Sequence, residues 1–150
     1  MRALVQRVSQ ARVSIEGSAV GEIGVGLLVF LGVSNTDSTS VTEKLARRVL
    51  SLRIFPDAAG KMNQSVRDIS GELLIVSQFT LYANTSRGNR PSFMNAAAPE
   101  LAEQLYKLFL EICATSCRRV EAGKFQAHME VSLINDGPVT IMLDSAVGGT

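Results

Sequence analysis

Polar and apolar residues alternate near the start of the chain and predict a β-hairpin. Residues 11–15 (ARVSI) show the two-residue period of a strand with one buried face. The turn formers Glu16-Gly17-Ser18 follow directly, so residues 1–23 are predicted to form a strand pair or meander. Residues 26–33 (GLLVFLGV) are continuously apolar, which predicts a strand that is buried on both faces.

Two helices are predicted, because apolar residues recur at helical spacing in two segments. Ser40 and Glu43 fit a capping box at the start of the first helix, which must end before Phe55-Pro56. Pro99 is predicted to begin the second helix. The apolar faces consist of Val41, Leu45, Val49 and Leu52 in the first helix and of Leu101, Leu105, Leu108 and Ile112 in the second.

Further apolar segments predict more strands, separated by polar loops. Residues 72–82 (ELLIVSQFTLY) predict a second buried strand, and residues 83–99 predict a long loop. Apolar residues then occupy the odd positions of 125–133, which predicts another strand, and residues 139–143 predict the last one. Between these two strands, Asn135-Asp136-Gly137-Pro138 is expected to form a turn.

Length and composition are those of one globular domain. Two helices and about seven strands in 150 residues predict a single α+β domain over residues 1–150. The net charge of +1 argues against a protein that coats nucleic acid by charge alone, although it is compatible with one that grips a single RNA end. The longest apolar run, residues 25–33, is well short of the ~18 residues that span a membrane. Since residues 1–8 do not resemble a signal peptide, a cytoplasmic protein is expected.

The sequence offers few groups for metal or cofactor chemistry. Cys113 and Cys117 are four residues apart, and His128 is the only histidine, whereas zinc sites need three or four ligands. We therefore expect no metal and no cofactor, and two buried or half-buried thiols on a helix. His128 lies on the polar face of a predicted strand, so a surface histidine is a simpler interpretation than a catalytic base.

Two short segments are unusual. Ser77-Gln78-Phe79-Thr80 places polar side chains at the end of an apolar strand, where they could be cross-strand partners or could line a ligand pocket. Residues 135–140 (NDGPVT) could be a plain turn between strands or a functional loop. The residue pattern alone leaves both alternatives open.

Together, SQFTL at 77–81 and NDGPVT at 135–140 resemble the two signature motifs of D-aminoacyl-tRNA deacylases. The resemblance extends over essentially the whole chain, including residues 3–8, 21–33 and 90–93. It implies the deacylase fold, in which mostly antiparallel strands form a curved, barrel-like sheet with two main helices. It also implies a homodimer with active sites at the subunit interface that hydrolyses the ester of D-aminoacyl-tRNA without a metal.

The resemblance further implies roles for the residues of both motifs. Ser77, Gln78, Phe79 and Thr80 form the catalytic segment, facing a cis Gly137-Pro138 peptide of the partner subunit. That peptide excludes L side chains from the site, so D-amino acids and glycine are accepted, including glycine mischarged on tRNA(Ala). Thr80 is either the nucleophile or part of a site driven by backbone N–H groups and the ribose 2′-hydroxyl. We favour the second mechanism, because no base is evident to activate Thr80.

Other residues are expected to hold the tRNA. The resemblance assigns Phe125 and Met129 to the terminal adenine, although both could equally be core residues. Arg7 is expected to steady the Gly137-Pro138 turn by a hydrogen bond to its backbone. Arg87, Arg90 and Lys124 could contact tRNA phosphates, or they could equally be ordinary solvated charges. Two other functions stay open, a Thr- or Ser-nucleophile esterase or peptidase for small molecules and a non-catalytic RNA- or DNA-binding module.

Overall fold

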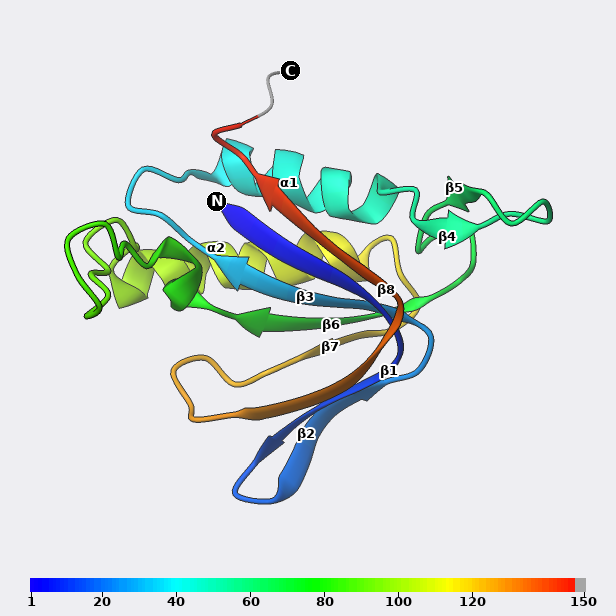
Figure 1. The fold of residues 1–150 in the computed structure, drawn as a ribbon, viewed down its shortest axis with the longest axis horizontal. Helices are drawn as coiled ribbons and strands as arrows, with labels where there is room; N and C mark the ends of the chain where they lie inside the picture. The colour runs from blue at the N-terminus through cyan, green and yellow to red at the C-terminus, as the bar shows by residue number, and fades with distance from the viewer. Residues whose placement is uncertain (148–150) are drawn as a thin grey trace.

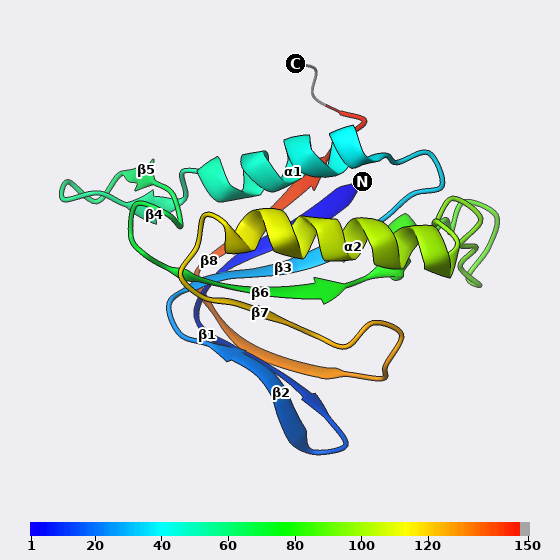
Figure 2. The ribbon, with the colours of Figure 1, turned by 180° about the vertical axis from the view of Figure 1, so that it is seen from behind.

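A computed structural model describes residues 1–147, which form one curved sheet with two helices on one of its faces (Figures 1 and 2). The strands are β1 (Arg2–Ile15), β2 (Ser18–Ile23), β3 (Gly26–Gly32), β4 (Phe55–Pro56), β5 (Met62–Gln64), β6 (Glu72–Ser77), β7 (Val120–Ala122) and β8 (Glu130–Asp144). The helices are α1 (Thr39–Ser51), α2 (Pro99–Ala114) and the short 3₁₀-helix η1 (Phe79–Tyr82). The predicted α+β class is confirmed.

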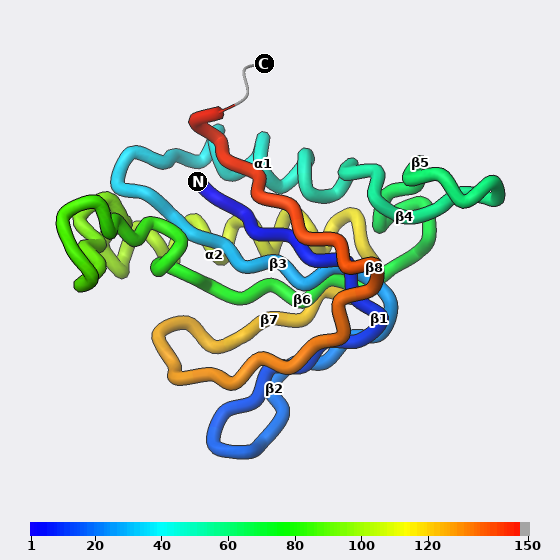
Figure 3. The backbone as a smooth tube through the Cα atoms, viewed as in Figure 1, coloured from blue at the N-terminus to red at the C-terminus, as the bar shows by residue number. Residues whose placement is uncertain are grey.

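The sheet has the strand order β2-β1-β3-β6-β7, with β8 paired along the other edge of β1. The pairs β3–β6 and β6–β7 are parallel, whereas β1 pairs antiparallel with β2, β3 and β8. The long β1 bends, so that β2 curls toward β7 at the far edge (Figure 3). A Cβ on Gly21 of β2 would lie 3.1 Å from the Ala122 carbonyl oxygen of β7, so glycine permits this approach. The nearly closed, barrel-like sheet was also predicted.

Two apolar clusters lie on opposite sides of the sheet. One fills the space between the sheet and the helices, and the other lies inside the curve of the strands. Successive residues of β6 alternate between them, with Leu73 and Ile75 in the first cluster and Leu74 and Val76 in the second. Because β3 alternates in the same way, residues 26–32 are buried on both faces, as predicted.

Both helices lie where they were expected, but the first begins earlier. Ser38 caps α1 by accepting a hydrogen bond from the Val41 N–H, so the capping box predicted at Ser40 is wrong by two residues. The helix ends at Ser51, before Pro56. Pro99 is the first residue of α2, as predicted.

Three strand predictions need correction. The strand predicted over 72–82 ends at Ser77, where η1 takes over. The strand predicted over 125–133 begins only at Glu130, because the positive φ of +63° at Gln126 interrupts the extended chain. The turn predicted at 135–138 is instead a bulge inside the continuous strand β8.

Candidate active site

The first motif bridges the end of β6 and the start of η1. The Gln78 N–H donates to the Leu31 carbonyl 2.8 Å away, which holds the chain against β3 beyond the last residue of β6. Leu81 N–H then donates to the Gln78 carbonyl at 3.2 Å, closing the first turn of η1. The N–H groups of Phe79 and Thr80 precede this bond, so the helix supplies no carbonyl for them. They are the backbone donors that this segment can offer to a ligand.

Side chains around η1 fix its position. The Gln78 side-chain amide donates to the Thr80 hydroxyl oxygen. The ring of Phe79 is 56% exposed and lies edge-on to Phe93, with 4.9 Å between the ring centroids. At the other end of η1, Arg2 donates to the Leu81 carbonyl at 2.8 Å. The segment is thus held by both the loop 83–98 and strand β1.

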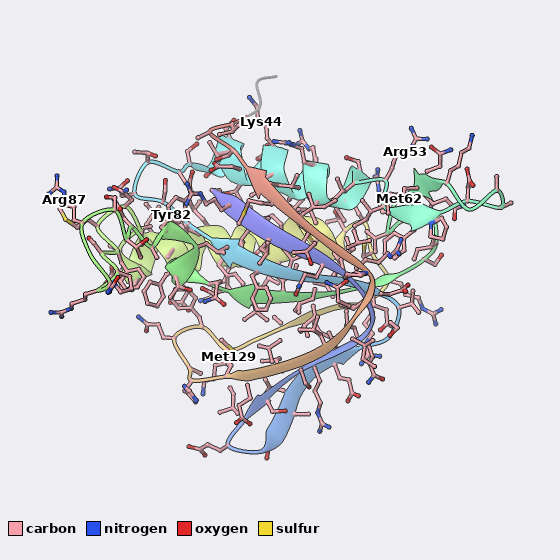
Figure 4. All side chains as sticks on the ribbon, in the orientation of Figure 1. Lys44, Arg53, Met62, Tyr82, Arg87 and Met129 are labelled. Atoms are coloured by element: carbon pink, nitrogen blue, oxygen red, sulfur yellow. The ribbon has the colours of Figure 1, made fainter. Side chains whose placement is uncertain are left out.

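An open pocket of about 840 Å³ lies beside the first motif. One wall comes from the end of β6 and the start of η1, and the facing wall comes from the segment between β7 and β8. Figure 4 labels Met129 on this second wall. The lining includes Ser77, Gln78, Phe79, Phe93, Phe125, His128 and Met129. The pocket therefore joins three residues of the first motif to both residues predicted to hold adenine, whereas Thr80 is not part of the lining.

Hydrogen bonds to the carbonyl oxygen of Ile75 position the facing wall. This oxygen accepts hydrogen bonds from the Tyr106 hydroxyl at 2.8 Å and from the Gly123 N–H at 3.1 Å. The Tyr106 ring in turn packs against Phe125, with 6.0 Å between centroids. A Cβ on Gly123 would lie 2.6 Å from the sulfur of Met129, so this glycine makes room for the methionine. Burial raises the pKa of Tyr106 to about 12, so its hydroxyl remains a neutral donor.

The second motif forms an exposed bulge, here called the 136–138 bulge (Asp136-Gly137-Pro138). Asn135 spans it, since its side chain accepts from the Val139 N–H at 2.7 Å and donates to the Thr140 hydroxyl at 2.8 Å. The Gly137–Pro138 peptide is cis, as predicted, and Gly137 has a φ of +141°. All three residues of the bulge are exposed.

Arg7 ties the bulge to a neighbouring segment. Its Nε donates to the Asp136 carbonyl at 2.8 Å, and its Nη1 donates to the Ile54 carbonyl at 2.7 Å. The side chain is only 12% exposed, and the Asp136 carboxylate lies 3.7 Å from Nε. The backbone hydrogen bond expected for Arg7 is therefore present, while its part in substrate binding stays a prediction.

The two motifs lie at opposite ends of the sheet. The bulge faces Arg7, which pairs with Leu27 of β3 and through it with Leu73 of β6, whereas Ser77 lies four residues further along β6. The separation is about 13 Å along the strands and about 14 Å across three strand spacings. In Figures 1 and 3 the bend of β8 lies at the right and η1 at the left. One chain does not bring the two motifs together.

The other predicted residues lie apart from both motifs or at the pocket rim. Arg87 and Arg90 are exposed on the loop 83–98, with Arg87 at its tip (Figure 4), and Lys124 is exposed after β7. Cys113 is buried and Cys117 is half-buried, as predicted, but only Cys113 is helical, because α2 ends at Ala114. Among residues 1–147, no group of three His, Cys, Asp or Glu side chains is arranged to hold a metal ion. No helix in the same range is long and apolar enough to cross a membrane.

Sequence reasoning missed the residues that brace the site. Tyr106 fits the apolar pattern of α2, and helical periodicity cannot show that a buried side chain also carries a hydrogen-bonding hydroxyl. Phe93 was noted only as part of the RPSF segment, and its contact with Phe79 depends on how the loop folds back. Asn135 was taken only as a turn former, although Asn side chains often hydrogen-bond to backbone a few residues along the chain, as this one does.

Comparison with known proteins identifies the family. A family model described as D-Tyr-tRNA(Tyr) deacylase matches residues 4–144. The D-aminoacyl-tRNA deacylase of Thermotoga petrophila is 56% identical over 97% of this chain and 98% of its own length. That of Paracoccus denitrificans is 57% identical over 97% and 98%.

Two solved structures share the fold. The c-Myc DNA Unwinding Element Binding Protein has a TM-score of 0.92 and 44% identity, covering 96% of this chain and 98% of its own. A probable eukaryotic D-amino acid tRNA deacylase has a TM-score of 0.80 over 95% and 97%, and at 20% identity it supports the fold alone. The chain therefore belongs to the D-Tyr-tRNA(Tyr) deacylase family, whose reaction is hydrolysis of the ester between a D-amino acid and tRNA.

Proposed function

We propose that the chain hydrolyses D-aminoacyl-tRNA at a composite site, formed by residues 77–80 of one subunit and the 136–138 bulge of a second. The observation that carries this proposal is the separation of the two motifs. The bulge is exposed, residues 77–80 are half-buried or exposed, and in one chain the two motifs lie at opposite ends of the sheet. A second copy that faces the first can bring a bulge to each pocket, as a two-fold dimer requires.

An apolar row on the sheet supports such a dimer. Leu4 pairs with Phe30 on one side and with Met142 on the other, so the three side chains share one face. Their neighbours Ala3 and Val5 point into the core beneath the helices, so this row lies on the face that α1 and α2 leave uncovered (Figure 1). Met142 is 47% exposed in the single chain. We infer that a second subunit covers this row.

The pocket is suited to the terminal adenosine of tRNA. Phe125 supplies an aromatic face and Met129 a flexible apolar side chain, both at the wall opposite the first motif. Both also pack against the core clusters, so the two interpretations open at the sequence level are compatible. With adenine at this wall, the ester carbonyl of the bound substrate lies toward residues 77–80.

Ester hydrolysis at this site needs positioning and charge stabilisation. A water oxygen adds to the ester carbonyl carbon, and the carbonyl oxygen takes up negative charge that the N–H groups of Phe79 and Thr80 stabilise. One such donor contributes about 3–4 kcal/mol in other hydrolases. Collapse breaks the bond to the ribose oxygen, which takes up the proton that the added water gives up and leaves as tRNA, releasing the free D-amino acid. The ribose 2′-hydroxyl, next to the ester, orients the water.

Selectivity comes from backbone that the substrate cannot displace. In the composite site, the 136–138 bulge crowds one side of the substrate α-carbon. Arg7 and the Asn135 side chain hold the bulge in place, so it does not yield to an L side chain. A D side chain points toward solvent, and glycine has no side chain to exclude. The enzyme therefore also clears glycine mischarged on tRNA(Ala), and its place is the cytoplasm, where translation uses these tRNAs.

Purified protein tests the proposal with D-Tyr-tRNA, L-Tyr-tRNA and Gly-tRNA(Ala), followed by release of the radiolabelled amino acid. We expect turnover of the D and glycyl substrates and little of the L substrate. Sedimentation velocity should give a dimer, and Met142→Glu should give an inactive monomer that keeps its circular dichroism spectrum. Equal rates on both enantiomers, or an active monomer, would contradict the composite site.

A further inference from the structure

Positive charge is concentrated in one part of the chain. Residues 43–68 contain six basic and three acidic residues, a net charge of +3, while the whole chain carries +1 and the remainder therefore −2. The six cations, here called the basic stripe, are all exposed. The stripe consists of Lys44, Arg47 and Arg48 on α1, Arg53 before β4, Lys61 in the β4–β5 hairpin and Arg67 after β5.

The acidic residues within this segment leave most of the stripe unpaired. Asp57 accepts from the N–H groups of Ala59 and Lys61 and from the Asn63 amide, and these hydrogen bonds hold its pKa below its usual value. Asp68 is similarly engaged by Ser65. Glu43 pairs with Arg47 at 3.5 Å. Within residues 1–147 no ion pair involves Lys44, Arg48, Lys61 or Arg67.

The stripe ends beside the 136–138 bulge. Arg7 bonds both to the bulge, through the Asp136 carbonyl, and to Ile54, which directly follows Arg53. Figure 4 shows Arg53 and Met62 at the same end of the molecule as the bend of β8, and Lys44 further along α1. The opposite end holds η1 and Arg87 (Figure 4). Within one chain the Arg53 end of the stripe is therefore close to the bulge, and α1 carries the stripe back from there along the molecule to Lys44.

We propose that the basic stripe of one subunit binds backbone phosphates of the tRNA whose aminoacyl end lies in the partner subunit's pocket. The inference rests on the proposed composite site, which brings the bulge of one subunit to the partner's pocket. The Arg53 end of the stripe then lies at the rim where the RNA backbone leaves that pocket. From there α1, with 13 residues and a length of about 20 Å, extends the positive surface over several phosphates.

Such contacts would be independent of tRNA sequence. Arg and Lys side chains that meet phosphates position an RNA without reading its bases, and each contact releases a bound counterion. The stripe would therefore raise the affinity for the whole tRNA and leave the terminal aminoacyl-adenosine unaffected. This separates its role from that of Phe125 and Met129, which contact the terminal nucleoside in the proposed site.

The test compares a whole and a minimal substrate. We expect Lys44→Gln/Arg48→Gln to lower kcat/KM for D-Tyr-tRNA about tenfold at low salt, through a higher KM. The slope of log kcat/KM against the log of the salt concentration should decrease in magnitude by about 2. Turnover of D-tyrosyl-adenosine should not change. Arg12→Gln/Lys107→Gln removes the same charge from exposed sites outside the stripe and should leave both substrates unaffected.

Mixed dimers test whether the stripe acts across the interface. One subunit carries Gly137→Ala, which disables the pocket of its partner, and the other carries the neutralised stripe. The one remaining site then uses an intact bulge beside a neutral stripe, and we expect the tenfold loss in kcat/KM for D-Tyr-tRNA. With both changes on one subunit, the remaining site should keep the wild-type KM.

Different results contradict the role of the stripe and the proposed deacylase function. Failure of the wild type on both D-tyrosyl-adenosine and D-Tyr-tRNA would contradict the proposed function itself. Wild-type turnover with an unaffected Lys44→Gln/Arg48→Gln variant would overturn the stripe alone, as would equal losses on both substrates. Binding to duplex DNA should be measured for the same variant. If Lys44→Gln/Arg48→Gln binds duplex DNA more weakly than the wild type but turns over D-Tyr-tRNA at the wild-type rate, the stripe is a DNA-binding surface and the inference is overturned.

Discussion

The guanidinium of Arg7 donates to the Asp136 carbonyl oxygen at 2.8 Å and joins the 136–138 bulge to the chain at Ile54. The two acceptors belong to segments far apart in sequence, and a planar guanidinium can reach both at once. The bulge itself is exposed, so it has little packing of its own to keep it in place. Its position in the proposed site therefore depends on this one side chain and on Asn135.

Arg7→Lys should lower activity, although the substitution keeps the positive charge. An ammonium on a flexible stem cannot hold both carbonyls in the geometry of the guanidinium. Hydrogen bonds from charged groups contribute about 1.5–3 kcal/mol each, so loss of one predicts a stability decrease of that size in urea denaturation. We expect kcat/KM on D-Tyr-tRNA to fall at least about tenfold, the equivalent of about 1.4 kcal/mol. Arg12→Lys, at an exposed position of β1, is the control, and a stability loss with unchanged kcat/KM would make Arg7 purely structural.

Gly137→Ala should damage the bulge directly. Gly137 has a φ of +141°, and an added Cβ would lie 2.7 Å from Val139 Cγ2 and 3.1 Å from Arg7 Nη2. Gly17→Ala is the matched control, because Gly17 has a φ of +78° but nothing within 4 Å of an added Cβ. Both variants should lose about 1–3 kcal/mol of stability from backbone strain. Only Gly137→Ala should lose activity, by about a hundredfold or more in kcat/KM, since about 3 kcal/mol of binding is at stake. Equal activity of the two would refute the role of the bulge.

The strands that the sequence predicts well are those with strict patterns. Residues 11–15 alternate because Ala11 and Val13 lie in the cluster inside the curve of the strands, whereas Arg12 is exposed. Residues 26–32 are apolar throughout because β3 contacts both clusters. The alternation over 125–133 misled for a physical reason. Phe125 packs against the cluster on the helix side and Met129 against the cluster inside the curve. Both are therefore apolar because each contacts a different cluster, and not because they lie on one face of a strand. Strand β7 has three residues, too few to carry a period.

The candidate site was predictable from its motifs but not in its arrangement. Ser77 and Gly137 were singled out by composition, yet their separation depends on the register of β8, β1, β3 and β6. Register is a long-range property that local patterns do not specify unless the strands are already paired. The close approach of Met129 to Gly123 depends on how the segment between β7 and β8 folds back, which the alternating pattern did not predict.

Stability should fall between about pH 9 and pH 12. Burial raises the pKa of the Cys113 thiol from 9.0 to about 12, and burial likewise raises the pKa of Tyr106 from 10.0 to about 12. In this range the groups ionise first in the unfolded chain, so stabilisation that is complete below pH 9 is lost as the pH rises. We expect the Tm to fall from pH 8 to pH 10.5, and to fall less in Cys113→Ala. An identical pH dependence in this variant would contradict the assignment to Cys113.

Gly123→Ala should weaken tRNA binding through Met129. The added methyl would lie 2.6 Å from the methionine sulfur, so the side chain must shift, and because Met129 lines the pocket we expect the shift to change the pocket's shape. We expect an increase in KM for both D-Tyr-tRNA and D-tyrosyl-adenosine with a smaller change in kcat. Met129→Ala in the Gly123→Ala background should restore part of the pocket volume and lower KM again. A double variant with the summed effects of both single changes would argue against this contact.

Thr80→Ala should remain active, because the proposed chemistry uses the N–H of Thr80 and not its hydroxyl. The hydroxyl oxygen accepts a hydrogen bond from the Gln78 amide, which cannot remove a proton. Within residues 1–147 no histidine, carboxylate or amine hydrogen-bonds to it. A nucleophilic hydroxyl needs such a base, so its removal should cost only the contact with Gln78.

We expect single-turnover rates of Thr80→Ala on D-Tyr-tRNA within about tenfold of the wild type, since one neutral hydrogen bond contributes about 0.5–1.5 kcal/mol. Gln78→Ala serves as the comparison, because it removes the same bond from the other side and also alters the pocket lining. Mass spectrometry of the quenched wild-type reaction should detect no acyl group on Thr80. An acyl-enzyme at this position, or a rate loss in Thr80→Ala of about a thousandfold, the scale of a lost catalytic nucleophile, would restore the covalent mechanism.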